Sequence, residues 1–296
     1  MEVNHPVTMP RLVPEERNRL IVFCEGNLYE QGHPTVYMIA VESYGDVQRI
    51  DMSIAFFGRQ IFPINAYVIG TLLIDTGAAN MSEEFLNVLT PFTIETVVNT
   101  HAHPDHVGSN YAFPFVFAHP NAFEKLQNPK LEMMIQKFLY GLPQPSTPKE
   151  VPKTLEVNDY VFHVLYTPGH SPDHISLYEP NQKWAFTGDL LLWGPTREVY
   201  VDVRIYDAMD SLHRLSELDI DVIFPGHGPP FKNPKDALTQ QVKTLGTFEM
   251  QVKELQERGW NAEEIRNHLF GRERMYVYLC GGKFSALNLV KSYLEG

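Results

Sequence analysis

A dense run of histidines near the middle of the chain restricts what the chain can fold into. Residues 99–108 read Asn-Thr-His-Ala-His-Pro-Asp-His-Val-Gly and follow directly on the largely apolar residues 94–98. Histidines that alternate at the end of a strand add little to a hydrophobic core, whereas imidazole nitrogens and carboxylate oxygens are ligands that zinc binds. The segment therefore predicts a metal site at the end of a strand, with candidate ligands at His101, His103, Asp105 and His106.

Three later segments repeat this arrangement, because each ends a strand-like run with a polar residue next to glycine. His170 follows residues 161–165, Asp189 follows residues 183–186, and His227 follows residues 221–224. A strand that stops at glycine lets the backbone turn sharply and present the next side chain at the edge of a sheet. We therefore expect four strand ends to meet in one place.

These four patterns, in this order, resemble the metallo-beta-lactamase superfamily. The resemblance runs from about Asp46 to Pro234 and includes the stretches 65–69 and 72–77. It implies an α/β fold, a four-layer αββα sandwich of two mixed sheets between outer helices, with metals at one edge of the sheets. It also implies a catalytic domain over residues 1–233, whose residues 1–45 are an N-terminal extension, and a helical C-terminal extension over residues 234–296.

The resemblance also assigns a role to each ligand. His101, His103 and His170 would hold one metal ion, Asp105, His106 and His227 a second, and Asp189 would bridge the two. Five histidines and two aspartates give two ions three or four ligands each and leave room for water, as catalytic sites require. We expect two divalent ions, zinc first, although iron and manganese accept the same ligands.

Such a pair of ions lowers the pKa of a bridging water to about 7, so that a hydroxide nucleophile exists at neutral pH. Asp105 is the candidate to orient this water or accept its proton. Asp75 is expected to support the 101–106 loop through hydrogen bonds, or to serve only in a turn. His174 is expected to support the site without binding metal. No pattern ties the acid that protonates the leaving group to Tyr200, Tyr206 or Trp193.

The overall charge narrows the substrate class. The chain has 24 basic and 36 acidic residues, a formal charge of −12, and no run of basic residues. Nucleic-acid binders usually show a basic stripe, so a nucleic-acid partner is disfavoured. We expect a hydrolase of a small ester, thioester or lactone. Two alternatives stay open: a phosphodiesterase or ribonuclease, because the 189–229 stretch resembles the beta-lactamase-like protein 2 group, and a non-hydrolytic iron-dependent redox protein.

Composition suggests where the protein resides. No apolar stretch approaches the roughly 20 residues needed to span a bilayer, so no membrane partner is expected. The polar N-terminal residues do not resemble a secretory signal, and Cys24 and Cys280 lie far apart in the sequence. We expect a cytoplasmic protein with free thiols. The sequence does not indicate an oligomeric state.

Residue patterns outside the histidine segments predict further elements. Strands are expected at 20–24 and 35–42, and helices at 122–126, 131–142, 234–258, 261–269 and 285–294, while 201–218 reads as an acidic stretch. Asn261 and Glu264 form a capping box at the start of their helix. The helix at 131–142 would either pack its apolar face on the domain or act as a lid that favours a substrate with an apolar part.

Overall fold

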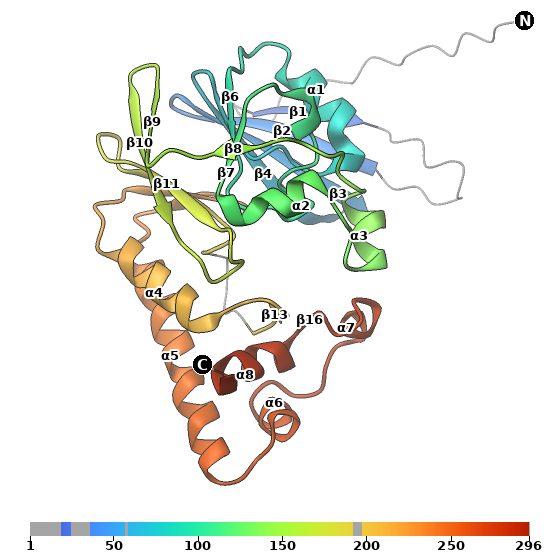
Figure 1. The fold of residues 1–296 in the computed structure, drawn as a ribbon, viewed down its shortest axis with the longest axis vertical. Helices are drawn as coiled ribbons and strands as arrows, with labels where there is room; N and C mark the ends of the chain where they lie inside the picture. Colours follow the sequence, from blue (N-terminus) through green and yellow to red (C-terminus); the bar gives the residue numbers. More distant parts are fainter. Residues whose placement is uncertain (1–18, 25–35, 57–58, 192–196, 296) are drawn as a thin grey trace, which may run out of the picture.

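The first of two large sheets begins as an antiparallel meander and ends with parallel strands (Figure 1). The computed structural model describes residues 19–24, 36–56, 59–191 and 197–295. This first sheet, sheet A, has eight strands in chain order: β1 (Arg19–Cys24), β2 (Val36–Tyr44), β3 (Val47–Phe56), β4 (Arg59–Ile69), β5 (Leu72–Ile74), β6 (Thr96–Val98), β7 (Val116–Ala118) and β8 (Lys149–Glu150). Pairing is antiparallel from β1 to β5 and parallel from β5 to β8.

The second sheet, sheet B, is antiparallel except at one pair of central strands. Its order is β15 (Phe231–Lys232), β14 (Val222–Pro225), β12 (Trp184–Gly188), β11 (Ile175–Glu179), β10 (Tyr160–Tyr166) and β9 (Thr154–Val157). Only β12 and β14 run parallel, so both strands end at the same edge. A separate ribbon pairs β13 (Val199–Tyr200) with β16 (Phe284–Ser285).

Alternating side chains on the strands create the layers. Tyr67 and Ile69 of β4 face sheet B and pack with Phe186 and Phe224, whose rings stack at 4.8 Å. The intervening residue Val68 faces the other way, into a core with α1 (Ser82–Leu89) and α3 (Met134–Leu139). This alternation along the strand therefore gives one core between the sheets and one outside sheet A.

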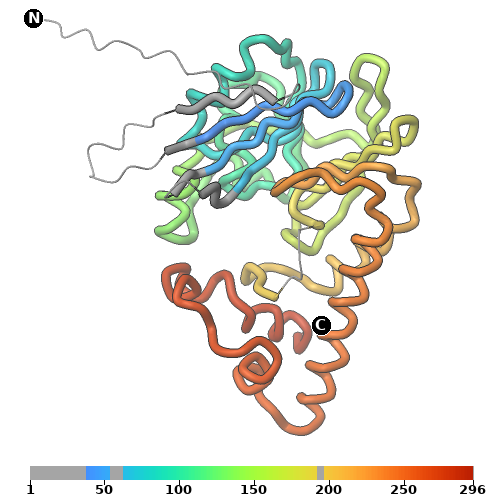
Figure 2. The backbone as a smooth tube through the Cα atoms, turned by 180° about the vertical axis from the view of Figure 1, so that it is seen from behind, coloured from blue at the N-terminus to red at the C-terminus, as the bar shows by residue number. Residues whose placement is uncertain are grey.

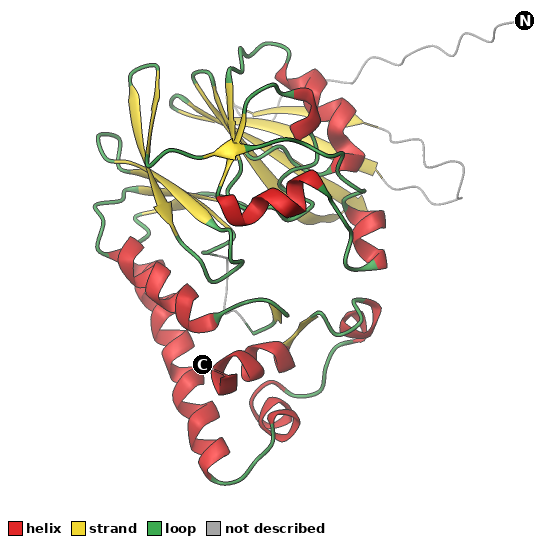
Figure 3. Cartoon of the chain, viewed as in Figure 1, coloured by secondary structure: helices red, strands yellow, loops and turns green. Residues whose placement is uncertain are grey.

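Helices from the second half of the chain share one core with the outer face of sheet B and extend this core away from the sheets (Figure 3). These helices are α4 (Ile205–Ser216), α5 (Lys235–Glu257), α6 (Ala262–Phe270) and α8 (Ala286–Glu295). The long helix α5 leads away from the sheets, and the chain then returns through α6, α7 (Met275–Leu279) and α8 (Figure 2). The predicted four-layer sandwich with C-terminal helices is confirmed, and these helices share one core with sheet B.

Several local predictions are also confirmed. Strands β1 and β2 extend sheet A, as expected for residues 20–24 and 35–42. The Asn261 side chain accepts hydrogen bonds from the amides of Glu263 and Glu264, each at 3.0 Å, and so begins α6. Helix α2 (Phe123–Gln127) lies where the 122–126 helix was expected. Cys280 is a free thiol, whereas the side chain of Cys24 lies outside the described residues.

One local prediction was wrong in its bounds, and one helix was not predicted. The helix expected over 131–142 covers only Met134–Leu139, because Gln136 caps it through the Met133 amide and Gly141 adopts a φ of 73° at its end. The left-handed conformation of that glycine stops the helix. The acidic stretch 201–218 contains α4, which buries residues at helical spacing that the acidic residues between them obscure: Ile205, Ala208, Leu212 and Leu215.

One structural observation concerns membranes. Within the ranges that the structure describes, no helix is both long enough and apolar enough to cross a bilayer.

The core between the sheets should dominate stability. Leu177 of β11 has no exposed surface, whereas Leu279 of α7 is 64% exposed. We expect Leu177→Ala to lower the free energy of unfolding by about 2–5 kcal/mol, since it removes buried methyl groups and leaves a cavity. Leu279→Ala, the same change on the surface, should alter it by less than about 0.5 kcal/mol. Urea denaturation of both variants checks this, and equal effects would contradict the assignment of this core.

Candidate metal centre

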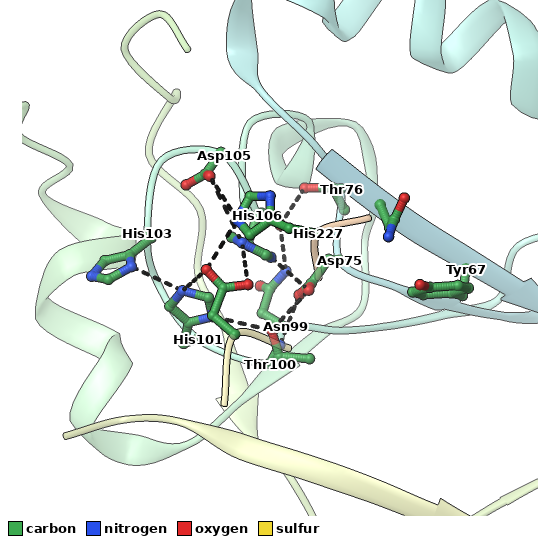
Figure 4. Close-up of polar contacts among 12 residues, drawn as sticks. Tyr67, Asp75, Thr76, Asn99, Thr100, His101, His103, Asp105, His106 and His227 are labelled. Atoms are coloured by element: carbon green, nitrogen blue, oxygen red, sulfur yellow. Dashed lines mark hydrogen bonds and ion pairs between the residues drawn. The ribbon is translucent and has the colours of Figure 1, made fainter. Parts of the chain in front are cut away.

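Four strand ends from the two sheets meet at one edge, and the candidate ligands lie there. Figure 4 shows five of them: His101, His103, Asp105, His106 and His227. The 101–106 loop follows β6 of sheet A, and His170 follows β10 of sheet B. Asp189 follows β12 and His227 follows β14, the two parallel strands of sheet B. The structure thus brings all seven side chains predicted from the sequence into one place, as two adjoining clusters.

The first cluster contains His101, His103, His170 and Asp189. Nδ1 of His103 lies 2.9 Å from Nε2 of His101 and 3.0 Å from Nε2 of His170. Nε2 of His170 lies 3.5 Å from Oδ2 of Asp189. Zinc bonds of about 2.0–2.1 Å in a tetrahedron place ligand atoms roughly 3.3–3.5 Å apart, close to these separations. The three ring nitrogens therefore already surround a point that one ion could occupy.

The second cluster contains Asp105, His106 and His227. Nε2 of His227 lies 3.5 Å from Oδ2 of Asp105, and Nε2 of His106 lies 3.9 Å from the same oxygen. The two imidazole rings are nearly perpendicular, at 87°, with their centroids 5.5 Å apart. This cluster offers two nitrogens and one carboxylate to a second ion.

Asp189 faces both clusters. Its Oδ1 lies 3.4 Å from Nε2 of His106, and its Oδ2 lies 3.0 Å from Nε2 of His227 and 3.5 Å from Nε2 of His170. The approach is possible because Gly226 has no side chain: a Cβ there would lie 2.3 Å from Oδ1 of Asp189. A carboxylate in this position can bridge two ions.

Buried atoms without partners support a metal site. Among the described residues, Nε2 of His106 and Oδ1 of Asp189 are both buried and have no hydrogen-bond partner. Buried polar atoms are normally hydrogen-bonded, so an orphaned pair calls for an explanation. A cation between them would satisfy both, and the nitrogen and oxygen donors suit zinc, iron or manganese. The residues present therefore fit a pair of metal ions.

Asp75 holds the histidine loop from beneath, as predicted. Its Oδ2 accepts from the Thr100 hydroxyl and lies 2.8 Å from Nδ1 of His106, while its Oδ1 accepts from the Thr100 amide at 2.7 Å. Asp75 also adopts a φ of 60°, a conformation that is costly for a residue other than glycine and is often retained at functional sites. The contact to Nδ1 leaves Nε2 of His106 directed at the clusters.

Two further side chains support the loop ends. Nε2 of His174 accepts a hydrogen bond from the Asp189 amide at 3.2 Å, and its Nδ1 lies 3.0 Å from the Thr167 hydroxyl. Both ring nitrogens are thereby engaged, so His174 has the supporting role that the sequence predicted. Asp173 was missed: its Oδ2 accepts from the Ala102 amide at 2.7 Å. Its position between two histidines of the 170–174 segment was the available signal.

Two tyrosines lie beside the clusters. The Tyr200 ring contacts the His103 ring edge to face, at 5.7 Å, and its hydroxyl donates to Glu132 at 2.7 Å. Burial, together with the nearby charges of Asp105 and Asp189, raises the pKa of Tyr140 well above its usual value. Tyr140 belongs to the 131–142 segment, for which the sequence left two alternatives, packing on the domain or a lid. Of the other two aromatic residues considered from the sequence, Tyr206 lies on α4 and donates to the Tyr293 carbonyl, and Trp193 lies outside the described residues.

The histidines of the two clusters differ in pKa, because the carboxylates lie closer to some of them than to others. Burial disfavours a proton on His227, but the carboxylates of Asp189 and Asp105 outweigh it and raise its pKa to about 9. Burial likewise opposes protonation of His106, and Asp189 and Asp75 outweigh it, so that its pKa is well above the usual value. Burial lowers the pKa values of His101 and His170 well below the usual value. In the metal-free protein, His106 and His227 therefore keep a proton to higher pH than His101 and His170 do.

Comparisons with known proteins agree with this geometry. The family model described as the metallo-beta-lactamase superfamily matches residues 59–227. A beta-lactamase-like protein 2 homolog from Caenorhabditis elegans is 31% identical over 177 residues, which are 56% of this chain and 56% of that protein. An atrochrysone carboxyl ACP thioesterase from Aspergillus fumigatus is 31% identical over 202 residues, 65% of this chain and 59% of that protein. The chain thus spans little more than half the length of the curated relatives it matches.

A solved structure shows the same fold. A metallo-beta-lactamase family protein from Thermus thermophilus superposes with a TM-score of 0.62 at 22% identity, covering 84% of this chain and 92% of that one. At this identity the likeness concerns the fold alone.

The raised and lowered pKa values predict how metal uptake depends on pH. Metals bind neutral imidazole, so an ion entering the second cluster must displace protons from His106 and His227. Its apparent affinity should rise, by about tenfold per pH unit for each displaced proton, as the pH increases toward the His227 pKa of about 9. The first cluster, where His101 and His170 are already neutral, should respond far less. Calorimetric zinc titrations in buffers of different ionisation enthalpy measure the released protons, and two equally pH-independent sites would contradict this assignment.

Proposed function

Because the chain belongs to the metallo-beta-lactamase superfamily, we propose that it is a dinuclear metal-dependent hydrolase of a small thioester, ester or lactone. One observation carries the proposal: a buried carboxylate, Asp189, is shared by two clusters of candidate ligands. A single structural metal would need only one closed set of four ligands. Two adjoining sets that share one aspartate are what a catalytic pair of ions requires.

The proposed ligands divide as the two clusters do. The first ion would be held by His101, His103, His170 and Asp189, and the second by Asp105, His106, His227 and Asp189. We propose zinc, because imidazole and carboxylate ligands in sets of three or four are typical of catalytic zinc. When bound, such a pair supplies a nucleophilic water at neutral pH and polarises the scissile carbonyl.

Residues of the chain then control the proton and the geometry. Asp105 lies at the second cluster, with Oδ2 facing the rings of His106 and His227, and we propose that its carboxylate orients the attacking water and accepts its proton. Asp75 holds His106 in one tautomer through Nδ1. Proton transfer by a positioned carboxylate of this kind contributes typically about 10²–10⁴-fold to a rate.

Two observations favour a small acyl substrate. The formal charge of −12 repels polyanions such as RNA. A relative that is 31% identical is named a thioesterase, and the short helix α3, which leads to Tyr140, leaves Met134 and Phe138 exposed. These apolar side chains suit a substrate with an apolar part. A phosphodiesterase of the same superfamily is the alternative function.

A substrate panel tests the proposed function. We expect the zinc-loaded full chain to hydrolyse small thioesters and esters, to lose this activity after dialysis against a chelator, and to regain it on addition of zinc. Metal analysis should find about two ions per chain in the active form, as a dinuclear site demands. Turnover of bis(p-nitrophenyl) phosphate without turnover of thioesters would favour the phosphodiesterase instead. Iron with no hydrolytic activity would favour redox chemistry.

The role of Asp105 is tested by an isosteric change. Asp105→Asn keeps the shape of the side chain but removes its basicity, so we expect turnover to fall by about 10²–10⁴-fold at saturating zinc. Steady-state kinetics with metal content measured on the same sample check this. Asp210→Asn on the surface of α4 is the control and should leave turnover unchanged. Near wild-type turnover of Asp105→Asn with both ions bound would refute the proposed role.

A further inference from the structure

The loop that carries His227 is held on two sides: the Gly226 amide donates to the Gly188 carbonyl of its own sheet at 2.7 Å, and one strand of the opposite sheet donates to the loop carbonyls. The loop begins at Pro225, the last residue of β14 in sheet B, yet the carbonyls of Pro225, Gly226 and Gly228 accept hydrogen bonds from β4 of sheet A. Asn65 donates through its side-chain Nδ2 to the carbonyls of Pro225 and Gly228, at 2.9 and 2.7 Å, and through its amide to the carbonyl of Gly226, at 2.8 Å. The carbonyls on both sides of His227 thus depend on Asn65.

Tyr67 adds a second donor from the same strand. Its hydroxyl donates to the Pro225 carbonyl at 2.6 Å. Figure 4 shows Tyr67 on the strand beside the ligand cluster. Because side chains alternate along a strand, Asn65 and Tyr67 point to the same face, the one toward sheet B. Asn65 has no exposed surface and Tyr67 is 2% exposed, so water cannot replace either donor.

Arg49 determines which way the Asn65 amide points. Its Nε donates to Oδ1 of Asn65 at 3.0 Å. Because a guanidinium only donates hydrogen bonds, Oδ1 must face it, and Nδ2 must then face the two carbonyls. Arg49 is in turn fixed by ion pairs with Glu42 of β2 and with Asp51 of its own strand, β3. The orientation is therefore set by buried charges and is not free to flip.

The ring of His227 is fixed by the same strand. Its Nδ1 donates to the Pro63 carbonyl of β4, and its Nε2 is thereby directed at Asp105 and Asp189. The first cluster has different supports: the Ala102 amide donates to Asp173, and the Thr100 amide donates to Asp75. The hydrogen bonds from β4 described above therefore position His227, a proposed ligand of the second cluster.

We infer that Asn65 and Tyr67, with the amide of Asn65 oriented by Arg49, are positioning residues that set the affinity of the second metal site through the backbone of the His227 loop. The inference rests on the proposed function, because it takes His227 as a ligand. Loss of groups that orient a metal ligand typically costs about 10–100-fold in metal affinity. The loss should fall on the second ion and spare the first.

Asn65→Asp is the sharpest variant, because it keeps the shape of the side chain but places oxygen where two carbonyls need a donor. Tyr67→Phe is the milder variant, because it removes one hydroxyl and keeps the ring in the core. Tyr293→Phe is its matched control: Tyr293 is a buried tyrosine of α8 that donates to the Leu245 carbonyl at 2.8 Å, within the C-terminal helices. All three variants use the full chain.

The metal-free protein is titrated with two metals. Calorimetry monitors the titration with zinc, and the visible spectrum of the bound ion monitors the titration with cobalt. In Asn65→Asp, and to a smaller extent in Tyr67→Phe, we expect the second ion to bind about 10–100-fold more weakly and the first ion to bind as in the wild type. The cobalt spectrum of the second site should change in these two variants, while that of the first site should not. Both sites of Tyr293→Phe should keep the wild-type spectrum.

The possible results separate the inference about Asn65 and Tyr67 from the proposed function. Two unchanged affinities in Tyr67→Phe and in folded Asn65→Asp would overturn the inference and leave the proposed function intact. Equal weakening of both ions, or the same weakening in Tyr293→Phe, would also overturn it, because the effect would then be general destabilisation. A wild-type chain that takes up no zinc or cobalt would overturn the proposed function itself. If Asn65→Asp does not fold, Tyr67→Phe alone decides by the same criteria.

Discussion

The structure around the site depends on one buried carboxylate. Asp189 is 7% exposed and lies among the rings of His106, His170 and His227. A buried charge is costly unless oppositely charged groups compensate it. In the metal-free protein the protons on His106 and His227 provide that compensation, and these two histidines hold the Asp189 pKa well below its usual value against the effect of burial. In the proposed metal-bound protein, two ions take the place of those protons.

The sandwich places this carboxylate because parallel strands end at the same edge. β5 and β6 of sheet A and β12 and β14 of sheet B are parallel pairs, and ligand loops follow β6, β12 and β14. Ligands in a loop are useful only if the loop is rigid. Asp75 and Asp173 hold the first loop, His174 holds the Asp189 amide, and Asn65 holds the His227 loop. Each support lies at least 15 residues away in the sequence from the backbone group that it contacts beside a candidate ligand.

The C-terminal helices also contribute to the surroundings of the site. β16 pairs with β13, and Lys283 lies 2.9 Å from the Glu132 carboxylate, which also accepts from Tyr200. Three segments are thereby joined beside His103: the stretch before α3, the β13 strand and the extension. The surroundings of the first cluster thus include residues of the C-terminal segment around Lys283, which lies close to the proposed chemistry.

The amino-acid sequence was enough to identify the seven candidate ligands and the fold class. Metal binding needs particular residue types, and the glycines at the strand ends are visible in the sequence beside those residues. It was also enough for the supporting roles of Asp75 and His174, which stand in the same motifs. It was not enough for Asp173, or for the joint role of three polar residues on strands β3 and β4: Arg49, Asn65 and Tyr67. On such strands an isolated polar residue reads as a solvent-facing position.

Three-dimensional packing was needed to show that these polar residues point into the space between the sheets and toward a loop some 160 residues away. The role of these residues depends on which strands pair and on which face of sheet A is covered by sheet B, and no local sequence pattern indicates either. The same holds for helix α4, whose buried spacing is hidden among acidic residues until sheet B gives it a surface to pack on.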